Sequence, residues 1–224
     1  MRRRATVLSL ASLLVLGPAL SVQARDAFVV AEVWVELDPI VADGSERPLA
    51  REVAMERLLS EVQYVVSGMV YGYRFTYVPS NPNRKVAEVF DLEPYAQIRR
   101  GDPRLTVLQT WVEESRLVAR VSYELAAEQE GWFQAWHSSA NVRSSGTGTA
   151  SLFRGPERKS EAVADGIRSA VREHVRAMEF TRPKQIVGAA LLASSPRTSI
   201  RRGNYQADVD VLLQIDRIDR YRTY

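Results

Sequence analysis

Two segments of this chain repeat their apolar residues at steps of three and four, whereas most other segments alternate apolar and polar residues with a period of two. The first pattern predicts amphipathic α-helices over residues 47–66 and 156–178, and the second predicts β-strands. Neither kind of element can bury its apolar face alone, so the helices and strands must share a core. The apolar positions of the two helices are Ala50, Val53, Ala54, Leu58, Val62, Val65 and Met69, followed by Val163, Ile167, Ala170, Val171, His174 and Met178.

The predicted order of elements is β-α-β-β-β-β-(β)-α-β-β. This order places the chain in the α+β class, with mostly antiparallel strands and two amphipathic helices packed on them. The segment 132–142 fits either an additional strand or a short helix. The strands are expected at residues 27–37, 69–78, 84–100, 105–112, 117–125, 186–193 and 207–215.

Small and polar residues mark the expected boundaries of these elements. Ser67-Gly68 is expected to end the first helix, Glu130-Gly131 to form a turn, and residues 194–204 to form a loop. No polar linker is long enough to separate two domains, so residues 25–224 are expected to form a single domain. Because each helix is followed directly by a strand, two related halves, about 25–103 and 104–224, are a further interpretation.

The N-terminus has the three-part pattern of a secretory signal peptide over residues 1–24. Three arginines precede an apolar run from Ala5 to Leu16, and Val22-Gln23-Ala24 fits the site that signal peptidase reads. The run is too short to span a bilayer, which requires about 20 residues. We therefore expect cleavage after Ala24 and a periplasmic or secreted protein with no transmembrane segment. The alternative is an uncleaved helix that lies in the membrane interface.

Removal of this segment also removes the excess of positive charge. The chain has 30 Lys and Arg against 27 Asp and Glu, and three of the arginines lie in residues 1–24, so 27 basic residues remain. A neutral mature chain lacks the basic charge of a nucleic-acid-binding protein, and no nucleic-acid partner is expected. The chain contains no cysteine, which excludes a thiol nucleophile, a thiolate zinc site and lipid attachment through an N-terminal cysteine.

Histidines and glycine-rich segments give no strong indication of catalysis. His174 lies on the apolar stripe of the second helix and His137 lies among aromatic residues, so packing explains both. Their spacing does not fit a metal site. Residues 145–149 contain two glycines but lack the Gly-Lys-Ser/Thr end of a phosphate-binding loop, and a strand is the simpler interpretation.

Carboxylates are the remaining candidates for acid–base chemistry. Glu113 and Glu114 are neighbours in a predicted hairpin turn and should diverge, while Asp208, Asp210 and Asp216 share the solvent face of the last strand. A solvated face is the first interpretation of this row, and a calcium or catalytic cluster is the second. We therefore expect no catalytic residues, no metal site and no cofactor.

The strand predicted at 69–78 carries aromatic side chains on one face, namely Tyr71, Tyr73, Phe75 and Tyr77. Aromatic side chains pack well on a pleated face beneath a helix, so a core position is the first interpretation. The alternative is an exposed row that contacts a protein partner or stacks on envelope glycans. These four residues are the candidate binding residues of the sequence.

The run Ala50-Arg51-Glu52-Val53-Ala54, followed by the helix, Ser67-Gly68 and an extended segment, resembles a pattern of exported bacterial envelope modules. These modules are the LPP20-like lipoproteins and the N-terminal domain of flagellar assembly protein T. The match covers about a fifth of the chain, which lacks the lipid-attachment cysteine. The resemblance implies a non-catalytic assembly role near the outer membrane or the flagellar motor.

Three hypotheses of function remain open. The first is a non-enzymatic exported protein of the bacterial envelope, with a structural or assembly role, that acts through protein partners or as a homo-oligomer. The second is a module that binds an envelope glycan or another small ligand through the aromatic strand. The third is a hydrolase that uses carboxylates such as Glu113 or Asp208.

Overall fold

The computed structural model describes residues 27–41, 47–155, 157–179 and 182–221. The predicted signal peptide, with its cleavage position at Ala24, lies outside these residues. The α-helices are α1 (Arg51–Val70), α2 (Ala127–Trp136) and α3 (Arg158–Met178). The strands are β1 (Phe28–Glu36), β2 (Tyr73–Val78), β3 (Val89–Pro94), β4 (Leu105–Glu113), β5 (Arg116–Glu124), β6 (Val142–Ser151), β7 (Gln185–Leu192), β8 (Arg197–Arg201) and β9 (Asn204–Asp219). Two short 3-10 helices cover Pro82–Arg84 and Leu152–Arg154.

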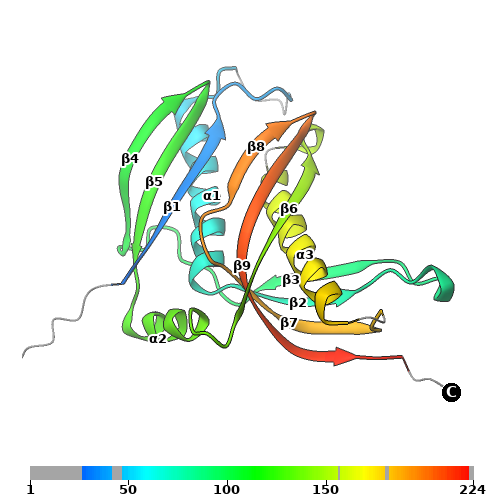
Figure 1. Cartoon of the computed structure of the whole chain (residues 1–224). Helices are drawn as coiled ribbons and strands as arrows, with labels where there is room; N and C mark the ends of the chain where they lie inside the picture. Colours follow the sequence, from blue (N-terminus) through cyan, green and yellow to red (C-terminus); the bar gives the residue numbers. More distant parts are fainter. Residues whose placement is uncertain (1–26, 42–46, 156, 180–181, 222–224) are drawn as a thin grey trace, which may run out of the picture.

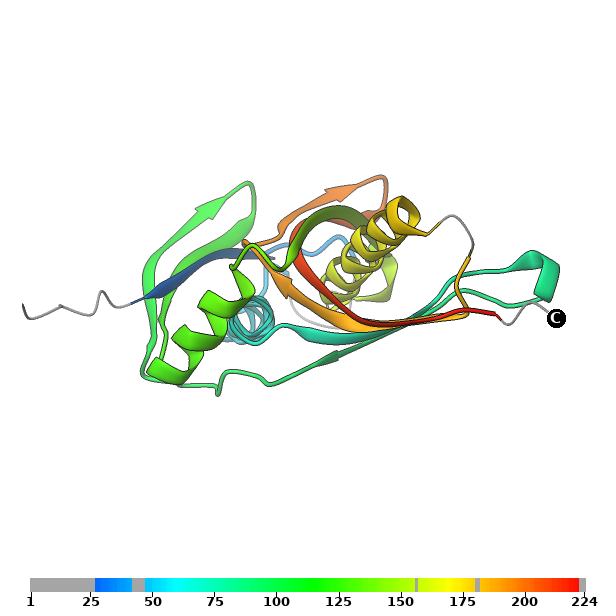
Figure 2. The ribbon, with the colours of Figure 1, turned by 60° about the horizontal axis from the view of Figure 1, so that its bottom comes forward.

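The strands form two antiparallel sheets, which confirms the predicted α+β class (Figure 1). The smaller sheet has the order β1-β5-β4. The larger sheet has the order β3-β2-β7-β9-β6, and β8 also pairs with β9. All pairings between the named strands are antiparallel. The connection between β2 and β3 projects at one end of the larger sheet (Figures 1 and 2).

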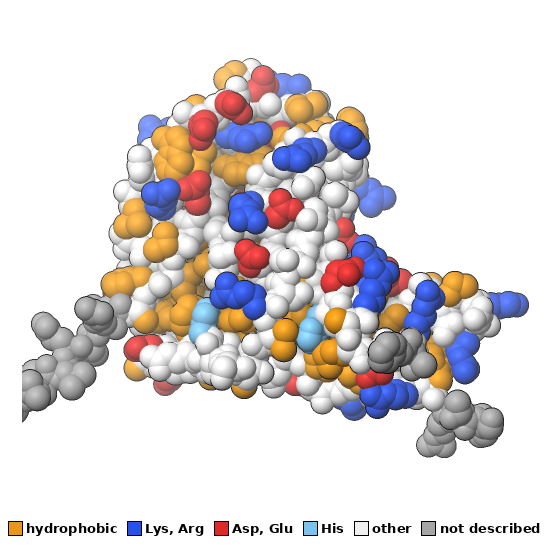
Figure 3. Space-filling model, in the orientation of Figure 1, with side chains coloured by type: hydrophobic (Ala, Val, Ile, Leu, Met, Phe, Trp, Pro, Cys, Tyr) orange, Lys and Arg blue, Asp and Glu red, His pale blue; other side chains and the backbone are white. Residues whose placement is uncertain are grey.

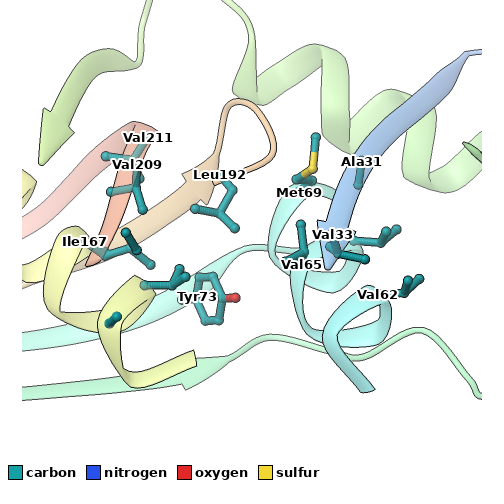
Figure 4. Packing of buried hydrophobic residues seen from close by; sticks show 14 of the residues in the cluster. Ala31, Val33, Val62, Val65, Met69, Tyr73, Ile167, Leu192, Val209 and Val211 are labelled. Carbon is teal, nitrogen blue, oxygen red and sulfur yellow. The ribbon is translucent and has the colours of Figure 1, made fainter. Parts of the chain in front are cut away.

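The two long helices bury their apolar stripes against these sheets. α1 packs on β1, β5 and β7, and α3 packs on β6 and β9. Most buried apolar side chains of the described residues form one continuous core between these helices, and a smaller cluster gathers around Trp136 of α2. Figure 4 shows part of the continuous core, where Tyr73 of β2 lies between Ile167 of α3 and Val65 of α1. The core therefore joins both sheets and both long helices.

The free edge of β1 meets the segment around β8. The Ser195 hydroxyl donates to the carbonyl of Glu32 at 2.9 Å and accepts from its amide at 3.2 Å. The indole nitrogen of Trp34 donates to the carbonyl of Thr198 at 3.3 Å. These bonds close the gap between the two sheets on this side, so the outer edge of β1 is partly covered.

The strands of the two suggested halves are intermixed. The smaller sheet combines β1 from the first half with β4 and β5 from the second, and the larger sheet pairs β2 with β7. Each of the two sheets therefore contains strands of both suggested halves.

The end of α1 differs from the prediction at Ser67-Gly68. Both residues are buried within the helix, which continues to Val70. A Cβ atom at Gly68 would lie 2.5 Å from the Tyr73 hydroxyl, so this glycine permits close packing and does not end the helix. The helix ends before Gly72, whose φ of 73° requires the left-handed conformation that glycine adopts readily.

Two other segments differ from the sequence prediction. Residues 132–136 of the ambiguous segment 132–142 belong to α2, so the short helix is the correct alternative there. Glu130-Gly131 lies inside this helix and not in a turn. The side chain of Gln129 accepts a hydrogen bond from the amide of Ala126 at 2.8 Å and stabilises the first turn. In the predicted loop at 194–204, residues 197–201 form β8.

Candidate functional site

The aromatic row of β2 belongs to the core. Tyr73, Phe75 and Tyr77 are 3%, 1% and 2% exposed. This burial agrees with the core interpretation and corrects the alternative of an exposed platform. The Tyr77 hydroxyl still reaches the edge of the core, where it donates to Glu88 at 2.8 Å. Burial raises the pKa of the Tyr64 hydroxyl, whose ring lies 6.0 Å from that of Tyr73, to about 12.

Tyr71 is separate from the other three aromatic residues, because it lies at the C-terminal end of α1 and not in a strand. Its side chain is partly exposed, and its hydroxyl accepts a hydrogen bond from the Gln129 amide at 2.7 Å. Of the four candidate binding residues, only Tyr71 can therefore contact a ligand without a rearrangement of the core.

The candidate carboxylates do not come together. Glu113 ends β4 in the smaller sheet and accepts a hydrogen bond from the Trp111 indole at 3.3 Å. Asp208 lies on β9 in the larger sheet and accepts from the Thr147 hydroxyl at 2.7 Å. Within the described residues, no group of three or more His, Cys, Asp or Glu side chains is placed to hold a metal ion. The structure thus does not combine Glu113 with Asp208 in one site.

The remaining sequence candidates have structural surroundings. His137 is exposed at the end of α2 and stacks on Phe133 at 4.0 Å between ring centroids. His174 is partly buried on α3, and burial lowers its pKa. Residues 145–149 lie in β6, where Gly146 and Gly148 permit contact with the backbone of α3, so this segment is a strand and not a phosphate loop.

The structure reveals a buried charged cluster that the sequence analysis did not identify. Lys159, in the first turn of α3, is 4% exposed, and its ammonium group lies 3.7 Å from the Glu61 carboxylate of α1. The ammonium group also donates to the Trp34 carbonyl and lies 4.1 Å from the centroid of its indole ring. Burial lowers the pKa of Lys159 and raises the pKa of Glu61.

A cavity of about 480 Å³ lies beside this cluster. Glu36 of β1 lines it and accepts a hydrogen bond from the Tyr205 hydroxyl of β9 at 2.5 Å. Burial is the largest cause that raises the pKa of Tyr205, followed by this hydrogen bond. Glu36 and Tyr205 are thus hydrogen-bonded to each other, and Lys159 is held by Glu61 and by the Trp34 carbonyl. The cluster joins α1, α3 and both sheets, and a role in stability accounts for it.

A second polar network lies at the base of the smaller sheet. The Arg104 guanidinium donates to both carboxylate oxygens of Asp102, at 3.1 and 2.9 Å, and to the Gln129 side chain at 3.2 Å. The Tyr123 hydroxyl donates to Asp102 at 3.2 Å. The hydrogen bonds of Arg104 are the largest cause that lowers the pKa of Asp102. Since Gln129 also contacts Tyr71, the network links α1, α2 and the strand ends.

This network forms the floor of a surface groove. Two hollows of about 300 and 500 Å³ share Tyr71 and Arg104 as lining residues. Trp132 lines the smaller hollow, is 42% exposed, and contacts the 40% exposed Tyr95 with its ring at 5.9 Å between centroids. The groove therefore combines exposed aromatic rings with guanidinium and amide groups.

The outer strand of the smaller sheet has the largest set of exposed apolar side chains in a single strand of the described residues. In β4, Val107, Leu108 and Val112 are 51%, 54% and 63% exposed. Figure 3 shows hydrophobic side chains along this side of the molecule. α1 packs on β1 and β5, and β4 is the end strand of the sheet. Exposed apolar side chains beside unpaired backbone groups are typical of a surface for strand addition.

Most of the chain has counterparts in known proteins. A protein-family model matches residues 16–221. A protein of Treponema pallidum (strain Nichols), described as an uncharacterized protein, is 25% identical over 201 residues, which are 86% of this chain and 81% of the relative. No solved structure matches the chain. None of the helices in the described ranges is long and apolar enough to cross a membrane.

Proposed function

We propose that this chain, which belongs to the protein family whose model spans residues 16–221, is a non-catalytic assembly protein of the bacterial envelope that acts through protein contacts. The contact surface in this proposal is the exposed edge of β4. Residues 1–24 would direct export, and the chain would work in the periplasm or outside the cell. An association with the flagellum is a narrower form of the proposal, supported by the resemblance at residues 50–54.

The exposure of β4 is the observation that carries the proposal. Its side chains Val107, Leu108 and Val112 are more than half exposed, and its only charged residue is Glu113 at the end of the strand. Sheet edges that face water are usually protected by charge, proline or a covering segment. β4 has a bulge between Val107 and Gln109, which is another such protection, but neither charge nor proline along most of its length, and this favours a partner that supplies a further strand.

The separation of the candidate carboxylates supports the non-catalytic part of the proposal. Glu113 and Asp208 belong to different sheets, and each is hydrogen-bonded to a neighbour in its own sheet. The buried Lys159 has a perturbed pKa, but its ammonium group is held by Glu61 and the Trp34 carbonyl. Glu113 and Asp208 thus form no acid–base pair with each other, and Lys159 is engaged in an ion pair with Glu61.

Site-specific cross-linking in the producing bacterium tests the proposal. A photo-reactive amino acid at Thr110 of β4 should give a discrete protein adduct in the periplasmic fraction, because this position lies on the proposed contact edge. The same amino acid at Asp91 of β3 is the matched control, since β3 is an edge strand of the other sheet. Equal adducts at both positions, or none at Thr110, would contradict the proposal. The mass of the recovered protein should correspond to a chain that begins at Arg25.

The groove at Tyr71 and Arg104 favours a second candidate function, the binding of an envelope glycan. Exposed aromatic rings stack on sugar faces, and planar guanidinium and amide groups bind hydroxyls. The groove places Trp132 beside Arg104 and Gln129, and the Tyr95 ring contacts Trp132 next to the groove. In this second candidate function, the glycan contacts the residues of the groove and not the aromatic face of β2.

Sedimentation with purified peptidoglycan tests the second candidate. The Trp132→Ala variant should lose most of its sedimentation, since it removes the larger exposed ring of the groove. Phe153→Ala is the control, because Phe153 is a 69% exposed aromatic residue outside this groove. Unchanged sedimentation of Trp132→Ala would exclude the groove as the glycan site.

A further inference from the structure

We propose that β4 pairs with β4 of a second copy of this chain, antiparallel, about a two-fold axis between Leu108 and Gln109. The two smaller sheets would then join into one sheet with the order β1-β5-β4-β4-β5-β1. This inference rests on the proposed function, because it uses the same edge, and it names the partner. The pairing would leave both larger sheets and their helices at the outside of the dimer.

Among the edges of the described strands, that of β4 is the best suited to this pairing. β1 has its edge partly covered by Ser195 and Thr198. β3 carries Asp91, Glu93 and Pro94, which are residue types that protect an edge. β6 is rich in serine, threonine and glycine, whereas β4 is long, apolar and charged only at its end. Pairing would remove the apolar side chains of β4 from water.

The bulge of β4 determines which self-pairing is possible. The register with β5 shifts between Val107 and Gln109, so Leu108 is an additional residue. The bulge changes which residues of β4 lie on the sheet face that packs on α1. Before the bulge these residues are Leu105 and Val107, and after it they are Thr110 and Val112. Residues directly opposite in an antiparallel pair must share a face. Odd-numbered residues before the bulge must therefore pair with even-numbered residues after it.

The register centred between Leu108 and Gln109 satisfies this condition at the positions on either side of the bulge. Leu105 lies opposite Val112 of the second copy, and Val107 lies opposite Thr110. On the other face, Thr106 lies opposite Trp111. Each of these pairs occurs twice because of the two-fold axis.

Charge complementarity supports the same register. Glu113 is the single charged residue of β4, and it would lie opposite Arg104 of the second copy, whose guanidinium also binds Asp102 of its own chain. A parallel pairing in register would instead place the two Glu113 carboxylates side by side, which is unfavourable. The antiparallel register thus pairs apolar with apolar or hydroxyl-bearing residues, and acid with base.

Disulfide trapping tests the register directly, because the natural chain has no cysteine. Purified mature Val107→Cys and Thr110→Cys variants, mixed and mildly oxidised, should form a covalent heterodimer faster than either variant alone forms a homodimer. Val107→Cys mixed with Trp111→Cys is the matched control, since these residues lie on opposite faces of the sheet. An equal rate for the control pair would overturn the register.

The oligomeric state of the purified protein tests the pairing itself. Light scattering after size-exclusion chromatography should give the mass of a dimer above about 10 μM, a range expected for a modest strand interface. Val107→Lys together with Val112→Lys should give a monomer, while Val89→Lys on β3 should remain a dimer. At concentrations where the parent protein is itself monomeric, the melting transition of the double variant should equal that of the parent. A monomeric parent protein up to about 0.1 mM would overturn the inference. The proposed function would survive that result if Thr110 still gave an adduct with a different protein.

Discussion

Lys159 carries a positive charge into a region from which water is largely excluded. Its side chain is 5% exposed and that of its partner Glu61 is 17% exposed. Removal of one member of a buried ion pair leaves the other charge uncompensated, which typically costs about 3–5 kcal/mol. We therefore expect Lys159→Met to lower the free energy of unfolding by about 3 kcal/mol, measured by urea denaturation.

Two control variants separate this charge effect from lost packing. Glu61→Gln combined with Lys159→Met removes both charges and should recover more than half of the loss. Lys184→Met changes an exposed lysine and should alter the stability by less than about 0.5 kcal/mol. If the double variant is as unstable as Lys159→Met alone, contacts of the lysine with Trp34, and not the charge of Glu61, account for the loss.

Asp102 gives a pH dependence with a defined sign. The hydrogen bonds from Arg104 lower its pKa in the folded protein below the usual value of 3.8. The unfolded chain then binds a proton more readily, so this contribution to stability is present at neutral pH and is lost as the pH falls through the lowered pKa. We expect Asp102→Asn to be less stable than the parent protein near neutral pH, and the difference to shrink in acid.

Urea denaturation from about pH 7 to about pH 3 measures this difference in the free energy of unfolding. The contributions of the other carboxylates cancel in the difference, because both proteins contain them. Asp91→Asn, an exposed acid on β3, is the control and should show no such trend. The free energy of unfolding of Asp102→Asn could instead differ from that of the parent protein by the same amount at every pH. That result would show that the carboxylate charge is not involved.

The sequence pattern indicates the unusual position of Lys159, but it does not indicate which residues lie around it. Lys159 precedes Val163 by four residues and thus extends the apolar stripe of its helix, where a charged residue is unusual. Glu36 and Tyr205 come from strands far apart in the sequence, and only the tertiary fold places them at the same cavity. Tyr71 was included among the candidates as part of a strand, although it lies at a helix end.

At the scale of secondary-structure elements, glycines determine how closely α3 approaches β6. A Cβ atom at Gly148 would overlap backbone atoms of Gly166 and Ala162 in the helix. Backbone cannot move aside as a flexible side chain can, so helix and strand would have to separate. We expect Gly148→Ala to lower the free energy of unfolding by at least about 2 kcal/mol, measured by thermal or urea denaturation.

Gly131 in α2 provides the opposite case and serves as the control. No atom lies within 4 Å of a Cβ built at this position, and the residue is inside a helix. Alanine stabilises a helix interior relative to glycine by up to about 1 kcal/mol. Gly131→Ala should therefore leave the stability unchanged or raise it. Equal destabilisation by both substitutions would mean that β6 and α3 are not in close backbone contact.

The sequence predicted best those elements whose pattern agrees with their surroundings. α3 and β5 follow a single periodicity from end to end, and both were predicted within a few residues of their observed bounds. The prediction failed where tertiary contacts override local preference. Ser67-Gly68 remains helical because it packs beneath Tyr73, and Ser67 accepts a hydrogen bond from the amide of Ile98 at 3.0 Å. Gly131 likewise does not prevent α2 from forming.

At the scale of the whole molecule, each sheet contains strands from both halves of the sequence, so we expect neither half to fold without the other. β5 lies between β1 and β4, and β7 lies between β2 and β9. The core contains residues of both sequence halves, and Tyr73 lies between the two long helices (Figure 4). Two halves with separate cores would each have their own cooperative transition, whereas a shared core predicts a single transition.

Fragments divided near residue 103 test this property. A fragment of residues 25–103 contains β1 without β5 and β2 without β7, so its apolar faces and strand edges would face water. We expect this fragment and the fragment 104–224 each to lack a cooperative unfolding transition by circular dichroism. A mixture of the two should regain one, because pairing of β1 with β5 and of β2 with β7 restores the core. A sharp transition in the isolated fragment 25–103 would instead indicate that the first half folds independently and that the mixed sheets form by later docking.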